Sequence, residues 1–219
     1  MEQVIDPAVH PGKPLLRGVS HEIAASLSLA AWVAMALTAP PGRASVAAHV
    51  YGASLFTLFA VSALYHRPMW SPRPRLLMRR LDHSAIFLLI AGTYTPMCLL
   101  LGEKGTPVLA LVWTGAVLGI FRAVLWPRAP RWLSAALYVL LGWLILPLLP
   151  AVARAAGAGG LVLLALGGLV YSLGAVVYAT KRPNPFPGVF GYHEVFHAMV
   201  IAAAALHFAV VLSALRRIG

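Results

Sequence analysis

Seven long stretches without lysine, arginine, aspartate or glutamate divide the sequence, and they limit its possible folds more than any other feature. Each is close to the roughly 20 residues that a helix needs to cross the hydrocarbon core of a bilayer. These stretches lack the polar–apolar alternation of strands in a membrane β-barrel. We therefore predict an all-α, polytopic membrane protein, a bundle of seven transmembrane helices. The predicted spans are residues 23–39, 44–65, 84–101, 106–121, 132–153, 155–180 and 195–215.

Little sequence is left over for anything except the membrane domain. We expect residues 1–22 to form a cytoplasmic tail and residues 216–219 a short C-terminal tail. The chain is 60% apolar and only 11% charged, whereas soluble domains are about 25% charged. This composition excludes an ordinary soluble enzyme and a disordered chain. Cys98 is the single cysteine, so an intramolecular disulfide and a cysteine-based metal site are excluded as well.

The formal net charge of +11 has a topological explanation. If the seven spans alternate in direction, 12 of the 17 lysines and arginines fall on the side of the N-terminus. Cytoplasmic loops of membrane proteins are enriched in lysine and arginine. We therefore predict that the N-terminus is cytoplasmic and the C-terminus outside, and we expect no nucleic-acid partner.

Ionisable residues beside membrane spans are costly and often mark a functional site. Odd-numbered spans begin on the N-terminal side of the membrane and even-numbered spans end there. Five ionisable residues at these span ends are therefore predicted to lie at a similar depth near the cytoplasmic face. They are Glu22, His66, Asp82, His193 and His197.

Histidine spacing makes a metal site the favoured interpretation of this group. His193 and His197 are four residues apart, so they share one helix face, as paired histidine ligands do in zinc proteases. His66 supplies a third imidazole, and Ser62 lies one turn deeper on the same face. Three histidines with an open fourth position are typical of catalytic zinc, although imidazole also binds iron, copper and nickel. Interfacial histidines that bind only water or lipid head groups remain the alternative.

Three segments of the sequence, in order, resemble motifs of a known family. They are Ser62–His66, the segment Leu81–Pro96 that contains Leu-Asp-His-Ser and Ala-Gly-Thr-Tyr-Thr-Pro, and Phe190–His197. Together they resemble the hemolysin III family, the bacterial arm of the progestin and adipoQ receptor (PAQR) superfamily. The resemblance covers nearly the whole chain after Gly18.

The resemblance implies a seven-helix bundle in the bacterial plasma (inner) membrane with its N-terminus inside. It implies one Zn²⁺ per chain, held by His66, His193 and His197 near the cytoplasmic face. Asp82 and Ser62 match the positions that surround the zinc-bound water in the eukaryotic relatives. Those relatives are associated with ceramidase-type amide hydrolysis.

The resulting hypothesis is a zinc-dependent intramembrane hydrolase that acts on a lipid amide or ester. Asp82 is expected to act as general base, and Ser62 to hydrogen-bond the water or the developing oxyanion. Glu22 and Glu194 are expected to be partners of the histidines that orient their rings. A membrane lipid is the expected substrate or ligand. Two alternatives stay open: a non-enzymatic receptor or regulator with a structural zinc, and a pore-forming hemolysin.

Overall fold

The computed structural model describes residues 13–218, and this part of the chain is almost entirely helical. Within it, extended pairing is limited to one isolated bridge between Phe186 and Phe190. The elements in order are α1 (Val19–Thr38), α2 (Arg43–His66), α3 (Pro72–Leu100), the 3₁₀ turn η1 (Gly102–Lys104), α4 (Thr106–Leu125), α5 (Arg131–Gly142), the 3₁₀ segment η2 (Trp143–Leu148), α6 (Leu149–Thr180) and α7 (Tyr192–Leu215).

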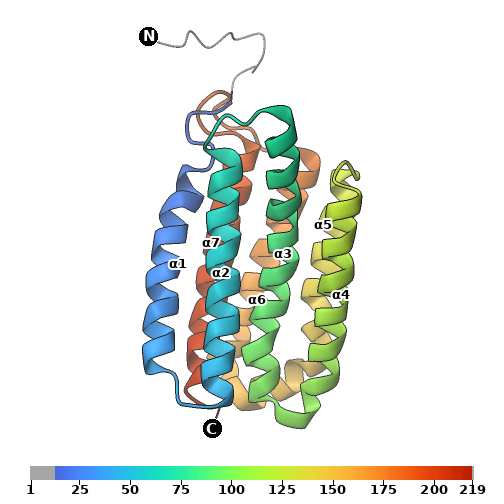
Figure 1. Cartoon of the computed structure of the whole chain (residues 1–219). Helices are drawn as coiled ribbons and strands as arrows, with labels where there is room; N and C mark the ends of the chain where they lie inside the picture. The colour runs from blue at the N-terminus through green and yellow to red at the C-terminus, as the bar shows by residue number, and fades with distance from the viewer. Residues whose placement is uncertain (1–12, 219) are drawn as a thin grey trace.

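The helices run roughly antiparallel in an elongated bundle (Figure 1). α1 packs on α2, α2 on α3, and α3 on α4, whereas α6 packs chiefly on α7. The last helix, α7, also contacts α1, α2 and α3. The start of α7 therefore lies near the start of α1 and the end of α2, which brings residues from both halves of the sequence to one end of the bundle.

The helix surfaces have the composition of a membrane protein. Six stretches of the described residues are long and apolar enough to cross a bilayer. Large apolar side chains such as Leu37, Leu125 and Leu140 are exposed on the outside of the bundle. Exposed apolar patches of this extent are rare on soluble monomers. The chain is an integral membrane protein.

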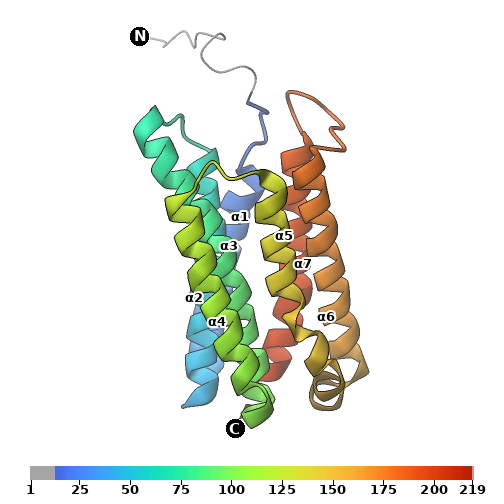
Figure 2. The same ribbon diagram turned by 90° about the vertical axis from the view of Figure 1, so that its right-hand side faces the viewer.

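One of the six stretches, Arg131–Thr180, contains 50 residues and combines α5, η2 and α6. A straight helix of that length would extend about 75 Å, more than twice the thickness of a hydrocarbon core. The chain instead turns back: α6 is interrupted at Gly157, which has φ 74° and ψ 173°. Figure 2 shows α5 and the long part of α6 side by side, joined at the lower end. The predicted spans 132–153 and 155–180 meet close to this reversal.

Helix α3 begins twelve residues before the predicted span 84–101. Pro72 lies in its first turn, where proline is well tolerated because the first N–H groups of a helix have no intrahelical partner. With 29 residues, α3 is about 44 Å long, against a hydrocarbon core of about 30 Å. Its basic first turns, which include Arg75 and Arg79, therefore extend beyond the apolar part of the bundle.

Small residues let neighbouring helices approach closely, as is common in membrane bundles. A Cβ atom on Gly52 would lie 2.3 Å from the Trp32 ring, and one on Gly119 would lie 2.3 Å from the Phe87 ring. At Gly92, between α3 and α2, a Cβ atom would lie 2.1 Å from Ser54 Oγ and 2.7 Å from Ser54 Cβ. These contacts leave no space for a larger side chain.

We predict that Gly92→Ala destabilises the contact between α2 and α3. Overpacking of this kind costs about 1–3 kcal/mol, so the thermal unfolding midpoint in detergent should fall by several degrees. Gly159→Ala is the matched control, because a Cβ atom there meets nothing within 4 Å, and alanine favours a helix over glycine. Equal midpoints for Gly92→Ala and wild type would contradict the close packing.

Candidate metal centre

Three histidines from two helices meet at the end of the bundle where α2 ends and α7 begins. His66 is the last residue of α2, whereas His193 and His197 lie in the first two turns of α7. One ligand nitrogen from each lies within 4.8 Å of the others, and the Nε2 atoms of His66 and His193 are 3.1 Å apart. The predicted convergence of these residues is therefore present in the structure.

Local interactions fix where α7 begins and so where its histidines lie. The Glu194 carboxylate accepts a hydrogen bond from the Gly191 N–H at 2.8 Å, which caps the helix. The Asn184 side-chain oxygen accepts the N–H of Tyr192 at 3.1 Å. A Cβ atom on Gly191 would lie 2.7 Å from that same oxygen, so glycine is needed for this close approach.

The donor set fits a transition-metal ion. Ligand nitrogens in a tetrahedral site with bonds of roughly 2.0–2.1 Å are about 3.3 Å apart, close to the 3.1 Å between His66 and His193. His197 is buried, and its Nδ1 atom has no hydrogen-bond partner in the described part of the chain. Neutral imidazoles are good ligands for zinc, copper, iron and nickel. The triad could therefore hold such an ion.

A fourth histidine, His21 of α1, lies against this group but was not among the residues that the sequence pattern indicated. Its ring stacks on His197, with 3.7 Å between centroids and 6° between planes. The His21 ring also packs against Phe59, with 5.0 Å between centroids and 74° between planes. His21 is buried, and neither of its ring nitrogens has a partner among residues 13–218. The stack restricts how far the His197 ring can rotate.

Ser62 and Asp82 line the same cavity as the three histidines. Ser62 is buried on α2, one turn from His66, and Asp82 is half-buried on α3. The cavity that contains the candidate metal centre therefore also contains a carboxyl group and a hydroxyl group.

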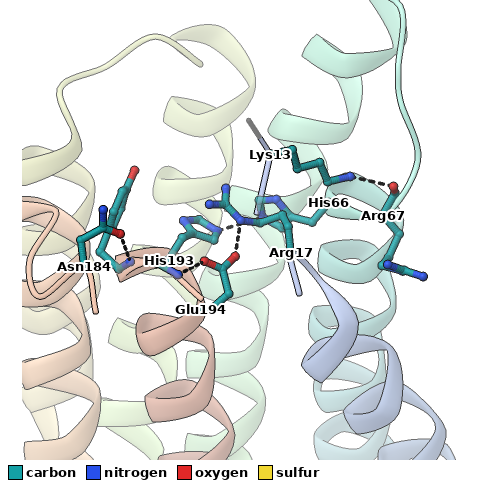
Figure 3. Close-up of polar contacts among 9 residues, drawn as sticks. Lys13, Arg17, His66, Arg67, Asn184, His193 and Glu194 are labelled. Carbon is teal, nitrogen blue, oxygen red and sulfur yellow. Dashed lines mark hydrogen bonds and ion pairs between the residues drawn. The ribbon is translucent and has the colours of Figure 1, made fainter. Parts of the chain in front are cut away.

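The two glutamates singled out in the sequence have different surroundings. Glu194 is buried and forms an ion pair with Arg17, in addition to capping α7 (Figure 3). Glu22 is exposed and pairs with Arg67 at 2.9 Å. Within residues 13–218, neither carboxylate forms a hydrogen bond or an ion pair with a histidine ring.

The segment before α1 contacts both the loop between α6 and α7 and the end of α2. Its backbone N–H groups at Leu15 and Leu16 donate to the carbonyls of Gly188 and Val189 at 3.0 and 3.2 Å. Gly18 has φ 83°, and a Cβ atom there would lie 2.9 Å from His66 Cβ. Glycine is required at this position for both reasons: the left-handed backbone and the close approach to His66.

A cavity of about 1280 Å³ begins at this end of the bundle and continues along its axis. Its upper wall contains the histidines, Ser62 and Asp82, and its lower wall contains apolar residues such as Met97, Ile145 and Leu164. Asp82 and Met97 are fifteen residues apart on α3, a rise of about 22 Å. The cavity is therefore deep enough to hold an acyl chain.

These features define an all-helical integral membrane protein with a candidate three-histidine metal centre. Sequence comparison confirms the expected family, because the family described as "Haemolysin-III related" matches residues 9–208. The chain belongs to the hemolysin III family.

Relatives in this family extend from bacteria to animals. The chain is 36% identical to "Hemolysin-3" of Bacillus cereus over 203 residues, 90% of each chain. It is 33% identical to the "Hemolysin-3 homolog" of Bacillus subtilis (strain 168) over 204 residues, 90% of this chain and 92% of the relative. A human PAQR-type relative, "Monocyte to macrophage differentiation factor", is 28% identical over 172 residues, 74% of this chain and 68% of the relative.

We predict that the purified protein binds one metal ion per chain and that His66→Ala, His193→Ala and His197→Ala each lower the metal content at least about tenfold. Removal of a ligand should cost no less than loss of a group that only orients one. Elemental mass spectrometry after purification without chelators measures this. His49→Ala is the control, because His49 is exposed and accepts a hydrogen bond from Trp32 Nε1. Metal content unchanged in all three variants would exclude the triad as the site.

Proposed function

We propose that this protein is a zinc-dependent intramembrane hydrolase that cleaves a lipid amide or ester. The observation that carries the proposal is the shared cavity: the triad, Asp82 and Ser62 line it together with basic side chains, and apolar side chains such as Met97, Ile145 and Leu164 line it further along. A substrate with its acyl chain in the apolar part would present its carbonyl to the polar groups. The family membership supports the same chemistry for this chain.

His66, His193 and His197 would hold the zinc ion, which when bound would acidify a water molecule and polarise a carbonyl group. In this proposal Asp82 accepts a proton from the attacking water and passes it to the leaving group. Ser62 can donate its hydroxyl proton to Asp82 or to the developing oxyanion. His21 keeps the His197 ring in position through the stack described above.

The proposed setting is a bacterial plasma membrane that the chain crosses seven times, with its N-terminus in the cytoplasm. The support is the separation of α5 from α6 at a reversal of the chain and the excess of basic residues at one end of the bundle. The candidate metal centre would then lie near the cytoplasmic face.

A structural role for the metal is the second candidate function. The observation that favours it is the origin of the ligands: His66 comes from α2, and both other histidines come from α7. An ion bound there would tie these two helices together, as a structural zinc does. In that case metal removal would lower the unfolding midpoint, and no lipid would be consumed.

We expect Asp82→Asn to lower hydrolysis of a fluorescent ceramide or acyl ester by about 10²–10⁴-fold, the usual contribution of a general acid–base group. Metal content should stay near one ion per chain, because Asp82 is not among the three ligands. Glu103→Gln removes a carboxylate that is exposed at the other end of the bundle and should leave turnover unchanged. Equal turnover in wild type and Asp82→Asn would exclude Asp82 as the base. If wild type hydrolyses none of the lipids tested, the result would favour the structural role of the metal.

The proposed topology predicts opposite results for two alkaline phosphatase fusions. The enzyme is active only outside the cytoplasm, so a fusion at the C-terminus should be active. A fusion after Asn184, between α6 and α7, should be inactive because this loop carries Lys181 and Arg182 and is assigned to the cytoplasm. The reverse pattern would invert the proposed orientation.

A further inference from the structure

The charges that line the cavity are strongly unbalanced. Asp82 is the one carboxylate in the described wall of the cavity, whereas six cationic side chains line the same wall. These six are Lys13, Arg17, Arg75, Arg79, Arg128 and Arg131.

Acidic side chains neutralise only part of this positive charge. Within residues 13–218, the ion pairs are Arg17 with Glu194 and Arg67 with Glu22. Lys13 donates a hydrogen bond to the Arg67 carbonyl at 2.7 Å. Burial lowers the pKa of Lys13, and the neighbouring guanidinium groups of Arg67, Arg17 and Arg75 lower it further. The local potential at this end of the cavity is therefore positive.

Arg131 is held in place although it has no acidic partner among these residues. Its Nη1 donates a hydrogen bond to the Tyr192 hydroxyl at 3.0 Å. Its guanidinium carbon lies 5.7 Å from the centre of the Tyr178 ring, and that ring lies 6.1 Å from the His193 ring. A fixed positive charge thus stands one aromatic ring away from the candidate metal centre.

Arg79 approaches the same region from α3. It lies three residues before Asp82, almost one helical turn, and it is half-buried in the cavity wall. Its helix neighbours Arg73 and Arg80 do not line the cavity. The preference for basic residues on the cytoplasmic side accounts for the sign of all these charges, but it does not require that any of them line a cavity.

Half-buried guanidinium groups bind carboxylate and phosphate through short, charge-assisted hydrogen bonds. A ligand anion in the cavity would supply the negative charge that the described residues lack. Because the Tyr178 ring alone separates Arg131 from His193, this anion would belong to the same head group as the reacting carbonyl. The remaining length of the ligand must be apolar to occupy the lower cavity.

We infer that Arg79 and Arg131, with Arg75 and Arg128 at the rim, select a substrate with a small anionic head group: an acyl chain joined through the scissile amide or ester to a group that carries a carboxylate or phosphate. The inference rests on the proposed hydrolase function for the scissile bond, but head-group binding can be measured without turnover. An N-acyl amino acid is the simplest member of this class.

A matched pair of ligands tests the charge requirement. N-palmitoylglycine and N-palmitoylethanolamide share the acyl chain and the amide, and they differ in a terminal carboxylate against a hydroxyl group. Binding of each radiolabelled ligand to the full-length protein in nanodiscs of zwitterionic lipid is measured by scintillation proximity. Wild type should bind N-palmitoylglycine about tenfold or more tightly than the neutral ligand.

Variants separate the cavity arginines from general surface charge. Arg79→Gln and Arg131→Gln should each weaken binding of N-palmitoylglycine about tenfold and leave binding of N-palmitoylethanolamide nearly unchanged. Arg131→Lys should retain part of the preference. Arg73→Gln removes the same charge from α3 outside the cavity wall and should alter neither affinity. Equal weakening of both ligands, or an equal effect of Arg73→Gln, would overturn the inference.

Two further arms distinguish the sources of the anion and the two proposals. If the arginines bind ordinary anionic membrane lipid instead, phosphatidylglycerol in the nanodiscs will abolish the preference for N-palmitoylglycine, and the inference fails. If N-palmitoylglycine binds selectively but is never hydrolysed, the hydrolase proposal fails and the binding site stands. Hydrolysis of both amides at equal rates, without selective binding, would leave the hydrolase and overturn the anion site.

Discussion

The bilayer interior tolerates neither unpaired backbone groups nor isolated charges, and the rest of this structure depends on that constraint. The backbone groups are paired within long helices, and the ionisable side chains gather at helix ends. Because α7 contacts α1, α2 and α3, its first turns bring His193 and His197 to the end of α2. The candidate metal centre therefore depends on helix order and span length as well as on the four-residue spacing of His193 and His197.

Much of this could be predicted from the sequence because hydrocarbon thickness sets the length of every span. Uncharged runs indicated the helices, and their alternation in direction indicated which polar residues share one end of the bundle. His66, His193 and His197 follow from that argument, and their ligand nitrogens do lie within 4.8 Å of one another. For these three residues, depth in the membrane and the shared helix face of His193 and His197 were together enough to predict the site.

Features that depend on helix rotation and on regions outside the hydrocarbon could not be predicted in this way. Glu22 and His21 are neighbours at one depth, but only His21 faces the triad; Glu22 points to Arg67. The first turns of α3 contain several arginines, so a search for apolar runs assigns this segment to a loop. Because α3 begins at Pro72, Arg75 and Arg79 lie on a helix and line the cavity wall. The rotation of each helix about its axis and its extension beyond the hydrocarbon therefore determine which side chains surround the candidate metal centre.

The separation of 127 positions between His66 and His193 in the sequence has a consequence for how the protein is made. At a synthesis rate of 5–20 residues per second, His66 leaves the ribosome about 6 to 25 s before His193. Until α7 has been synthesised and inserted beside α2, the chain offers only one of the three imidazoles. The candidate metal centre is therefore completed late in biogenesis, and a chain truncated before α7 would remain without the site throughout its lifetime.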